Sequence, residues 1–386
     1  MVFYRLQQAG FVLFFINKSV DTFLFQGHWT RPSTEVMPNR NTRHCKDLCM
    51  SRKKELPPTL WNIVSSPLKE EARKWFIRRA VVAGIPWEEL SNKYREPRNV
   101  ASLLEWKTQL ENLSIVYPEY FLQPFHGYDA GNMNWRAAEE GEAASLTMCA
   151  NYWKNVCAQD SEQWVRNNIT KNVISYLNRE HNNCINNDTT NSFDNIITIL
   201  DVGSSVGIST EYLSRGFPKA ERIYGLDLSP YFVAVSSFRA NKNKYDITYV
   251  HQNAEETQFS EKTFDLIVCN FFFHEVPRDA TDRILREMYR ILKPNGVLAI
   301  VDLDPAVLQD RVALSQFRKW AFEVTEPHIY QYYNGNMSET MQKNNFHNVV
   351  KRSNDPVNSI WIGSKHTLYE EPSQNMDNSV DDKRDD

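Results

Sequence analysis

The chain has 386 residues, of which 41 % are hydrophobic and 24 % are charged. These proportions are those of a globular protein and exclude a fibrous, collagenous or wholly disordered chain. The length allows one large α/β domain with appendages, or two domains of ordinary size. The net charge of -4 and the pI near 6.2 provide no overall field that would attract nucleic acid or an anionic membrane, so nucleic acid is not an expected partner.

The six cysteines do not form the dense framework that stabilises small secreted domains, so we interpret them as reduced thiols. Cys45 and Cys49, with His44 beside them, have the side chains that bind metals. Their CxxxC spacing has no second pair of ligands, however, and the sequence predicts no metal site.

The first 59 residues contain few acids, several basic residues and one short apolar run, Phe11 to Ile16. A membrane-spanning helix needs about 20 apolar residues, so no integral membrane segment is predicted here. The basic character favours a transit peptide over a signal-peptide core or a poorly ordered extension. We therefore expect residues 1–59 to be a disordered or targeting extension, and the localisation stays open between the cytoplasm and an organelle.

Residues 60–181 have a helical pattern and are predicted to form an N-terminal cover region. The expected helices are Leu68 to Ala83 after Pro67, Ala101 to Asn112 and Arg136 to Val156, and the chain then leads through Trp164 to Leu177 into the asparagine-rich segment. The stretch Tyr117 to Trp135 is aromatic and rich in turn formers, which is typical of structured loops that cover sites. The asparagine-rich residues 182–195 are predicted to be a linker or insertion.

From residue 196 onward, short β-branched apolar runs alternate with amphipathic stretches. The runs are Ile196 to Val202, Arg222 to Leu226, Ile247 to His251, Leu266 to Phe271, Val297 to Asp302, Asn348 to Arg352 and Ser359 to Gly363. This spacing predicts a parallel sheet with crossover helices, and the last two runs a closing pair of strands. The predicted sheet domain covers residues 196–368, and the acidic residues 369–386 are predicted to be a disordered tail.

A glycine-containing turn follows the first predicted strand, between Asp201 and a helix that begins near Ser209. This arrangement brings a ligand close to backbone amides at the edge of a doubly wound sheet, and Gly203 and Gly207 permit that approach. The second strand ends at Asp227, at a separation suited to the ribose hydroxyls of an adenosine-type ligand. The alternatives are a turn required for packing and a solvated aspartate.

Four segments in order resemble the motifs of class I S-adenosylmethionine-dependent methyltransferases. Asp201 to Gly207 resembles the DxGxGxG signature, Asn253 to Glu255 the adenine-contacting turn, Phe264 to Asn270 the FDLIxxN pattern and Ile291 to Gly296 the LKPxG turn. The His-containing segment Phe271 to Val276 is similar to the type 11 branch, which is related to quinone and sterol methyltransferases. The resemblance covers most of residues 196–305.

The resemblance implies S-adenosylmethionine as the cofactor. It also implies an α/β fold with a doubly wound, Rossmann-like sheet of seven mostly parallel strands and an antiparallel last strand, preceded by an N-terminal helical extension. The residues it assigns to cofactor binding are Asp201, Gly203, Ser204, Ser205, Gly207, Asp227, Leu228, Asn253, Ala254, Glu255 and Asn270. Two of them depart from the family pattern. Ser205 replaces the middle glycine, and Asn253 replaces an aspartate, keeping a side-chain acceptor without the charge.

The cofactor would bring an activated methyl group, so the protein must mainly align a nucleophile and exclude water. For an alcohol or phenol acceptor, removal of a proton would help, and His274 with Glu275 lies where the family opens its acceptor pocket. We therefore treat both as candidate catalytic residues, with a packed, structural His274 as the alternative. His126, Tyr128 and Asp129 are further candidates to cover the cofactor or meet the acceptor.

Three other functions are compatible with parts of the sequence. A nicotinamide-dependent oxidoreductase shares the sheet but requires a GxGxxG turn, which is absent. A non-catalytic binding protein with this fold is suggested by Ser205 and Asn253. An RNA methyltransferase is disfavoured because Asn270 is followed by phenylalanines rather than Pro-Pro-aromatic. The expected acceptor is small or lipid-like; its identity and the oligomeric state do not follow from the sequence.

Overall fold

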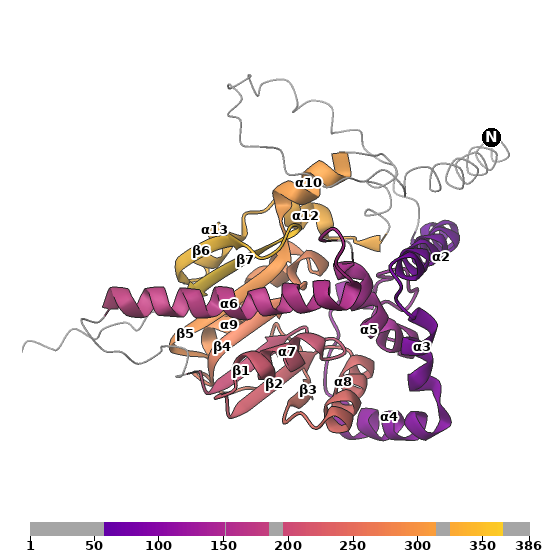
Figure 1. The fold of residues 1–386 in the computed structure, drawn as a ribbon, viewed down its shortest axis with the longest axis horizontal. Coiled ribbons are helices and arrows are strands. Elements are labelled where there is room, and N and C mark those ends of the chain that lie inside the picture. The colour runs from indigo at the N-terminus through magenta and orange to yellow at the C-terminus, as the bar shows by residue number, and fades with distance from the viewer. Residues whose placement is uncertain (1–57, 151, 185–195, 314–324, 366–386) are drawn as a thin grey trace, which may run out of the picture. The chain divides into compact units, whose positions relative to one another are not determined.

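The computed structural model describes residues 58–150, 152–184, 196–313 and 325–365. The predicted N-terminal extension, most of the asparagine-rich linker and the acidic tail therefore lie outside the described residues, apart from Pro58 and Thr59 of the extension. The described part contains the predicted cover helices and the complete predicted sheet (Figure 1).

Seven strands form one sheet in the order β3-β2-β1-β4-β5-β7-β6 (Figure 1). Their bounds are β1 Thr198–Val202, β2 Arg222–Asp227, β3 Thr248–His251, β4 Phe264–Asn270, β5 Leu292–Leu303, β6 His347–Ser353 and β7 Asn358–Ser364. The first five strands pair in parallel, while β7 is antiparallel to both β5 and β6. The strand order reverses between β1 and β4, which confirms the predicted doubly wound fold and places a ligand crevice at the carboxyl ends of these strands.

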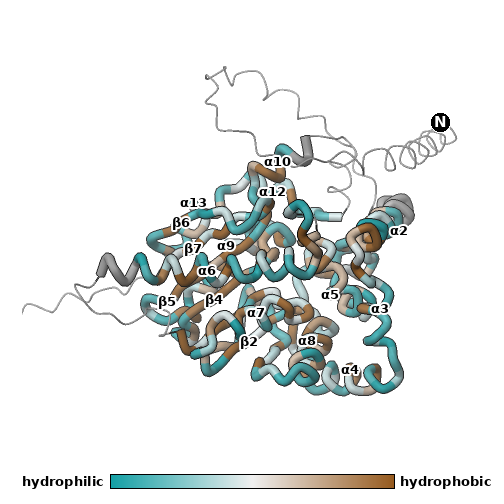
Figure 2. Tube along the Cα trace, viewed as in Figure 1, coloured by the Kyte–Doolittle hydropathy of each residue, from teal (hydrophilic) through white to brown (hydrophobic). Residues whose placement is uncertain are grey.

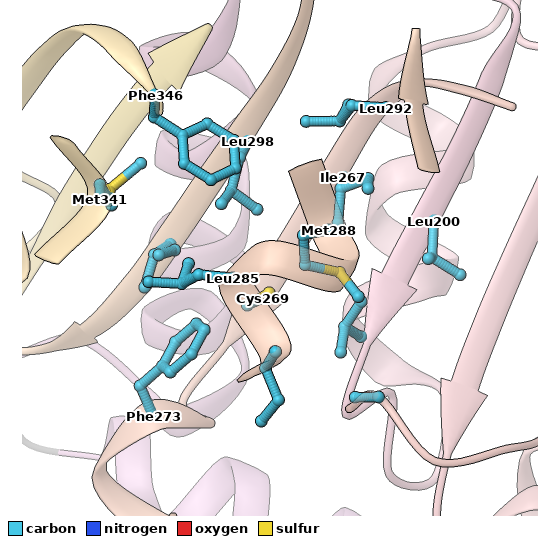
Figure 3. Close-up of a cluster of buried hydrophobic side chains, with 14 of the residues drawn as sticks. Leu200, Ile267, Cys269, Phe273, Leu285, Met288, Leu292, Leu298, Met341 and Phe346 are labelled. Atoms are coloured by element: carbon cyan, nitrogen blue, oxygen red, sulfur yellow. The ribbon is translucent and has the colours of Figure 1, made fainter. Parts of the chain in front are cut away.

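Successive residues of β1 face opposite sides of the sheet, as a strand period of two requires. Ile199 packs in the cluster that includes α6 (Ala158–Cys184) and α7 (Ile208–Gly216), and Leu200 packs in the cluster formed with α9 (Arg278–Ile291) and α13 (Met337–Lys343). Figure 3 shows side chains of this second cluster, with Met288 and Leu285 of α9 facing Leu200, Ile267, Cys269 and Leu298 of the strands. Hydropathy is highest along these central strands (Figure 2).

The N-terminal helices pack around the sheet domain through α8 (Pro230–Asn243), which contacts α4 (Pro97–Leu110) and α5 (Trp135–Cys149). Helix α3 (Trp87–Asn92) packs on α5. Three predicted bounds were wrong. Helix α2 (Pro58–Val82) begins ten residues before Leu68, since Pro58 rather than Pro67 is at its first position; α4 begins at Pro97; and α5 ends at Cys149.

The chain after β5 forms α10 (Pro305–Ala313), α12 (Ile329–Tyr333) and α13 before it returns to the sheet through β6 and β7. A hollow at the surface lies between this insertion and the start of α9. Its walls include Phe273, Val276, Tyr332 and Met337. Among the helices that the structure describes, none combines the length and the apolar character needed to cross a bilayer.

Candidate active site

Asp201 lies at the carboxyl end of β1 and is fully buried. Its Oδ2 accepts hydrogen bonds from the hydroxyls of Ser209 (2.5 Å) and Thr210 (2.7 Å), and its Oδ1 accepts one from Nδ2 of Asn270 (3.2 Å). Burial raises the pKa of the carboxyl, while these three donors oppose the rise. Asp201 therefore holds the first turn of α7 and the end of β4 in place.

The turn between β1 and α7 has left-handed backbone at Gly203 (φ 68°), Ser205 (φ 49°) and Gly207 (φ 87°). A Cβ at Gly203 would lie 2.5 Å from the ring of Phe272, and one at Gly207 would lie 2.3 Å from the Tyr249 hydroxyl. These two positions therefore require glycine for both conformation and space. Ser205 has a side chain in a conformation that favours glycine, which locates the departure from the motif in the middle of the turn.

Asp227 lies next to this turn, at the end of β2. Its Oδ2 accepts from the backbone N–H of Ser205 and its Oδ1 from that of Ser229, both at 2.8 Å. Burial raises the pKa of the carboxyl to about 7, although the two backbone donors oppose the rise. Since each carboxylate oxygen has a further acceptor site, Asp227 is oriented to receive a pair of hydroxyl groups.

Asn270 provides a second acceptor at the same edge. Its Nδ2 donates to the Asp201 carboxylate, which can only accept, so the amide orientation is determined and Oδ1 is directed elsewhere. This oxygen is buried and has no hydrogen-bond partner among the described residues. A buried acceptor without a partner is costly, and a ligand that carries an ammonium or hydroxyl group would satisfy it. The ribose and amino group of S-adenosylmethionine fit Asp227 and Asn270 respectively.

The predicted adenine turn after β3 is held mainly by contacts within the protein. Oδ1 of Asn253 accepts from the backbone N–H of Glu255 (3.0 Å), and Ala254 is buried. The Glu255 carboxylate accepts from the Tyr120 hydroxyl (2.6 Å) and forms an ion pair with Arg283. These residues shape the turn, and a contact between Asn253 and adenine stays a prediction.

Two further predicted residues contribute through their backbone. The Leu228 carbonyl is 3.0 Å from Nε2 of His251, the last residue of β3. The Ser204 N–H donates to the carbonyl of Leu226 (2.9 Å), as does the Gly203 N–H (2.8 Å). These hydrogen bonds connect the end of β2 to β3 and to the glycine turn, and they determine where the glycine turn lies relative to Asp227.

His274 belongs to a short helical turn, η4 (Phe273–Glu275), after β4. Its Nδ1 lies 2.7 Å from Oδ1 of Asp302, and its backbone N–H donates to Oδ2 of the same residue (3.1 Å). Burial alone would lower the pKa of His274, but the Asp302 carboxylate outweighs burial and raises this pKa to about 9. The arrangement is a histidine oriented by a buried carboxylate, a common arrangement for proton transfer.

Asp302 was missed in the sequence prediction. It is fully buried at the carboxyl end of β5, and β5 pairs directly with β4. The available signal was an acid at the end of the fifth predicted strand, because the carboxyl ends of neighbouring parallel strands meet at one edge.

The predicted aromatic loop crosses this edge, and we call residues 112–134 the strap. It includes the short turn η2 (Glu119–Leu122). Its contacts with the sheet edge are Asn112 N–H to His251 Nδ1 (2.9 Å), Tyr117 hydroxyl to His251 Nε2 (3.2 Å), Tyr120 hydroxyl to Glu255, His126 Nε2 to Glu275 (3.0 Å) and Ser229 hydroxyl to the Asn132 carbonyl (2.7 Å). The strap thus contacts the segments that follow β2, β3 and β4.

The strap residues named as further candidates have different positions. His126 meets Glu275, the second candidate catalytic residue. Tyr128 donates instead to Glu140 of α5 (2.5 Å), where it anchors the strap. Asp129 lies in the strap as well. Within the described ranges, no group of three or more His, Cys, Asp or Glu side chains is arranged to hold a metal ion.

Comparison with known proteins locates a family match on the same segment. Residues 200–300 match the family model described as a methyltransferase domain. This segment runs from the end of β1 into β5 and includes the glycine turn, Asp227, Asn270 and His274. Residues 200–300 thus resemble a methyltransferase domain of the type 11 branch. The match agrees with the methyltransferase resemblance found in the sequence, and the strand order shows the predicted fold class.

Similar proteins include the ubiquinone/menaquinone biosynthesis C-methyltransferase UbiE of Agrobacterium fabrum, which is 33 % identical over 143 residues, 34 % of this chain and 54 % of that protein. A demethylmenaquinone methyltransferase of Anoxybacillus flavithermus is 30 % identical over 28 % of this chain and 46 % of its own. The chain spans about half the length of the curated relatives it matches. A solved SAM-dependent methyltransferase from Aquifex aeolicus has a TM-score of 0.35 at 18 % identity, covering 44 % of this chain and 81 % of its own.

Proposed function

We propose that this protein transfers the methyl group of S-adenosylmethionine to a small or lipid-like acceptor that carries an ionisable hydroxyl group. The observation that carries the proposal is the position of Asp227 and Asn270 on either side of the glycine turn, at the edge where the strand order reverses. The Asp227 carboxylate can accept hydrogen bonds from two vicinal hydroxyl groups, and the buried Oδ1 of Asn270 can accept one from an amino group.

When bound, the cofactor supplies a methyl group on a positively charged sulfonium. The residues of this chain bind and orient it: the Gly203 backbone allows close approach, Asp227 accepts from the ribose hydroxyls and Asn270 accepts from the amino group. Carboxylates at the same edge, including Glu275 and Asp302, favour a cationic ligand.

His274 is suited to remove the proton of the acceptor. Its pKa of about 9 leaves it protonated at neutral pH, because Asp302 stabilises the imidazolium. A bound sulfonium adds positive charge nearby, which lowers the pKa of His274 and favours the neutral base once the cofactor is in place. Glu275 adds negative charge beside the ring. We therefore assign proton removal to His274, its orientation to Asp302, and an electrostatic contribution to Glu275.

The acceptor class is supported by the surroundings of His274. The ring of Tyr332 lies 6.2 Å from that of His274, edge to face, and Phe272 packs on Gly203. Aromatic walls beside a base suit a flat or apolar acceptor with a hydroxyl group. The relatives named as ubiquinone/menaquinone biosynthesis C-methyltransferase and demethylmenaquinone methyltransferase agree with such an acceptor, although these names describe those proteins.

The first test is calorimetric titration of the full chain with S-adenosylmethionine and with S-adenosylhomocysteine. We expect micromolar binding that is lost in Asp227→Ala and retained in Asp246→Ala, a matched control at an exposed position outside the site. Absence of binding by the unmodified protein would overturn the proposal and favour a methyltransferase fold without catalytic function.

A further inference from the structure

His126 lies at the tip of a two-residue turn in the strap. The backbone N–H of Phe125 donates to the carbonyl of Tyr128 (3.1 Å), and the N–H of Tyr128 donates to the carbonyl of Phe125 (2.8 Å). The two central residues, His126 (φ 51°) and Gly127 (φ 84°), are both left-handed, as a type I′ turn requires. The turn therefore presents the imidazole at a defined position on the strap.

Both nitrogens of this imidazole face carboxylates. Nε2 lies 3.0 Å from Glu275 of η4, and Nδ1 lies 3.0 Å from Glu326, in the segment that leads into α12. The His126 backbone N–H also donates to the carbonyl of Thr325 (3.3 Å). Only the imidazolium form donates from both nitrogens, so this geometry requires a protonated ring. Partial desolvation of the ring opposes the charge, but Glu326 and Glu275 outweigh it and raise the pKa of His126 to about 10.

Three other titratable groups are coupled to this cluster. The charge of His274 is favoured by Glu275 and Glu326, that of His328 is favoured by Glu326, and Glu275 raises the pKa of Asp227. The two carboxylates thus act electrostatically on both the strap histidine and the candidate base. One further atom of the cluster, Oε2 of Glu326, is buried without a hydrogen-bond partner among the described residues, which makes the cluster dependent on the His126 contact for compensation.

We propose that His126 is a latch: as an imidazolium that bridges Glu275 and Glu326 it holds the strap closed over the cofactor edge, and loss of its proton releases the strap and accelerates cofactor exchange. The closed position of the strap is supported by the contacts of His126 with Glu275 and Glu326. The effect on cofactor exchange rests on the proposed function, because it requires that S-adenosylmethionine and its product bind beneath the strap.

The direction of the pH dependence follows from linkage. A histidine whose pKa is about 10 in the closed state and 6.5 in the open state favours closure fully below about pH 6.5, and this preference is lost as the pH rises through 10. The His126 side chain is 37 % exposed, so solvent screens both ion pairs. We therefore expect strap opening to increase several-fold, and less than tenfold, per pH unit within that window.

Amide hydrogen exchange of the full chain without ligand, measured between about pH 6.5 and 9.5, tests the latch directly. Each measured exchange rate is divided by the intrinsic rate of an unfolded peptide at the same pH, so that only the opening of the strap is compared. The variants are His126→Asn, which keeps a residue favoured in this turn, and Glu326→Gln. We expect strap peptides to exchange about threefold faster or more at pH 7 in both variants, with a flatter pH dependence. The matched control is Glu119→Gln, an exposed glutamate of the same strap, which should behave like the unmodified protein. Unchanged strap exchange in both latch variants would overturn the proposal.

The dissociation rate of S-adenosylhomocysteine tests the link to exchange. In the unmodified protein we expect release to accelerate several-fold from pH 7 to pH 9, and in His126→Asn to be fast at both values. Release that is equally slow in His126→Asn would refute gating. Failure of the ligand to bind at all would instead refute the proposed function, and the exchange data would still decide whether His126 closes the strap.

Discussion

Asp227 is only 7 % exposed, and two backbone amides donate to it, yet burial still raises its pKa to about 7. The folded state therefore favours the protonated carboxyl, whereas the binding role requires the carboxylate. The contribution of Asp227 to stability is present below its ordinary pKa near 4 and is lost as the pH rises to about 7. The residue that binds ribose in our proposal thus destabilises the protein at neutral pH.

We predict that Asp227→Asn increases the free energy of unfolding at pH 8 by about 1–3 kcal/mol, because the amide is neutral and keeps one acceptor oxygen. The gain should shrink at pH 5 and vanish near pH 4. The same variant should weaken S-adenosylhomocysteine binding more than tenfold. Urea unfolding at the three pH values, with calorimetry, checks both effects. A loss of stability at pH 8 would contradict this account of Asp227.

The pairing of His274 with Asp302 makes a prediction for the candidate base. In Asp302→Asn we expect the pKa of His274, followed by NMR titration, to fall well below about 9, since only the weaker contributions of Glu275 and Glu326 then oppose burial. Asp304→Asn is the matched control, because Asp304 pairs with Lys351 and Ser359 rather than with His274.

Activity distinguishes a base from a packed side chain. His274→Asn should lower kcat about 10²–10⁴-fold once an acceptor is identified, and should leave S-adenosylhomocysteine affinity unchanged. The kcat of the unmodified protein should rise with pH and level off below about 9, because the bound sulfonium lowers the pKa of His274 from its value in the free protein. If His274→Asn has a normal rate and an unchanged pH profile, His274 is a packed side chain in the wall of the acceptor site and not the base.

At the scale of elements, α9 joins the sheet to the site, because η4 precedes it directly. Its apolar face is fully buried, and Leu285 packs among β4, β5 and α13 side chains (Figure 3). We predict that Leu285→Ala lowers the free energy of unfolding by about 2–5 kcal/mol, through lost burial and the cavity that it leaves. Arg286→Ala, on the exposed face of the same helix, should change it by about 0.5 kcal/mol or less.

Urea titration measures both variants. If Leu285→Ala is as stable as Arg286→Ala, the packing of α9 against the sheet is not what the structure describes. In the folded Leu285→Ala protein, affinity for S-adenosylhomocysteine should be retained, since the side chain faces the core rather than the strand ends.

The elements with regular periodicity were predictable. The predicted strand runs match β1 to β7 closely except at the start of β5, and the helical spacing of Ala280, Ile284, Met288 and Ile291 in the sequence corresponds to the buried face of α9. Bounds controlled by local turn chemistry were less accurate. The turn residues 294–296 fall within β5, which extends back to Leu292 and pairs there with Phe264; a sequence pattern does not show that pairing.

The site was predictable where one segment carries the motif and not where two segments meet. The glycine turn and Asp227 follow from spacing, but Asp302 is recognised only once β5 lies beside β4. The contact between His126 and Glu326 joins residues 200 apart in sequence. Such a contact depends on the path of the strap and of the insertion after β5, which periodicity does not determine.

At the scale of the whole molecule, the strap's contacts with the sheet edge have consequences for the order of folding. They join residues separated by 97 to 149 positions, whereas β1 and β2 pair within 24 residues. Closing long loops costs entropy that is recovered only once the partner surface exists. The sheet can therefore form before the strap settles on it. We therefore expect a newly made chain to expose the strand ends around Asp227 and Asn270 to solvent before the strap covers them, and a ligand bound there at that stage would provide part of the surface on which the strap completes folding.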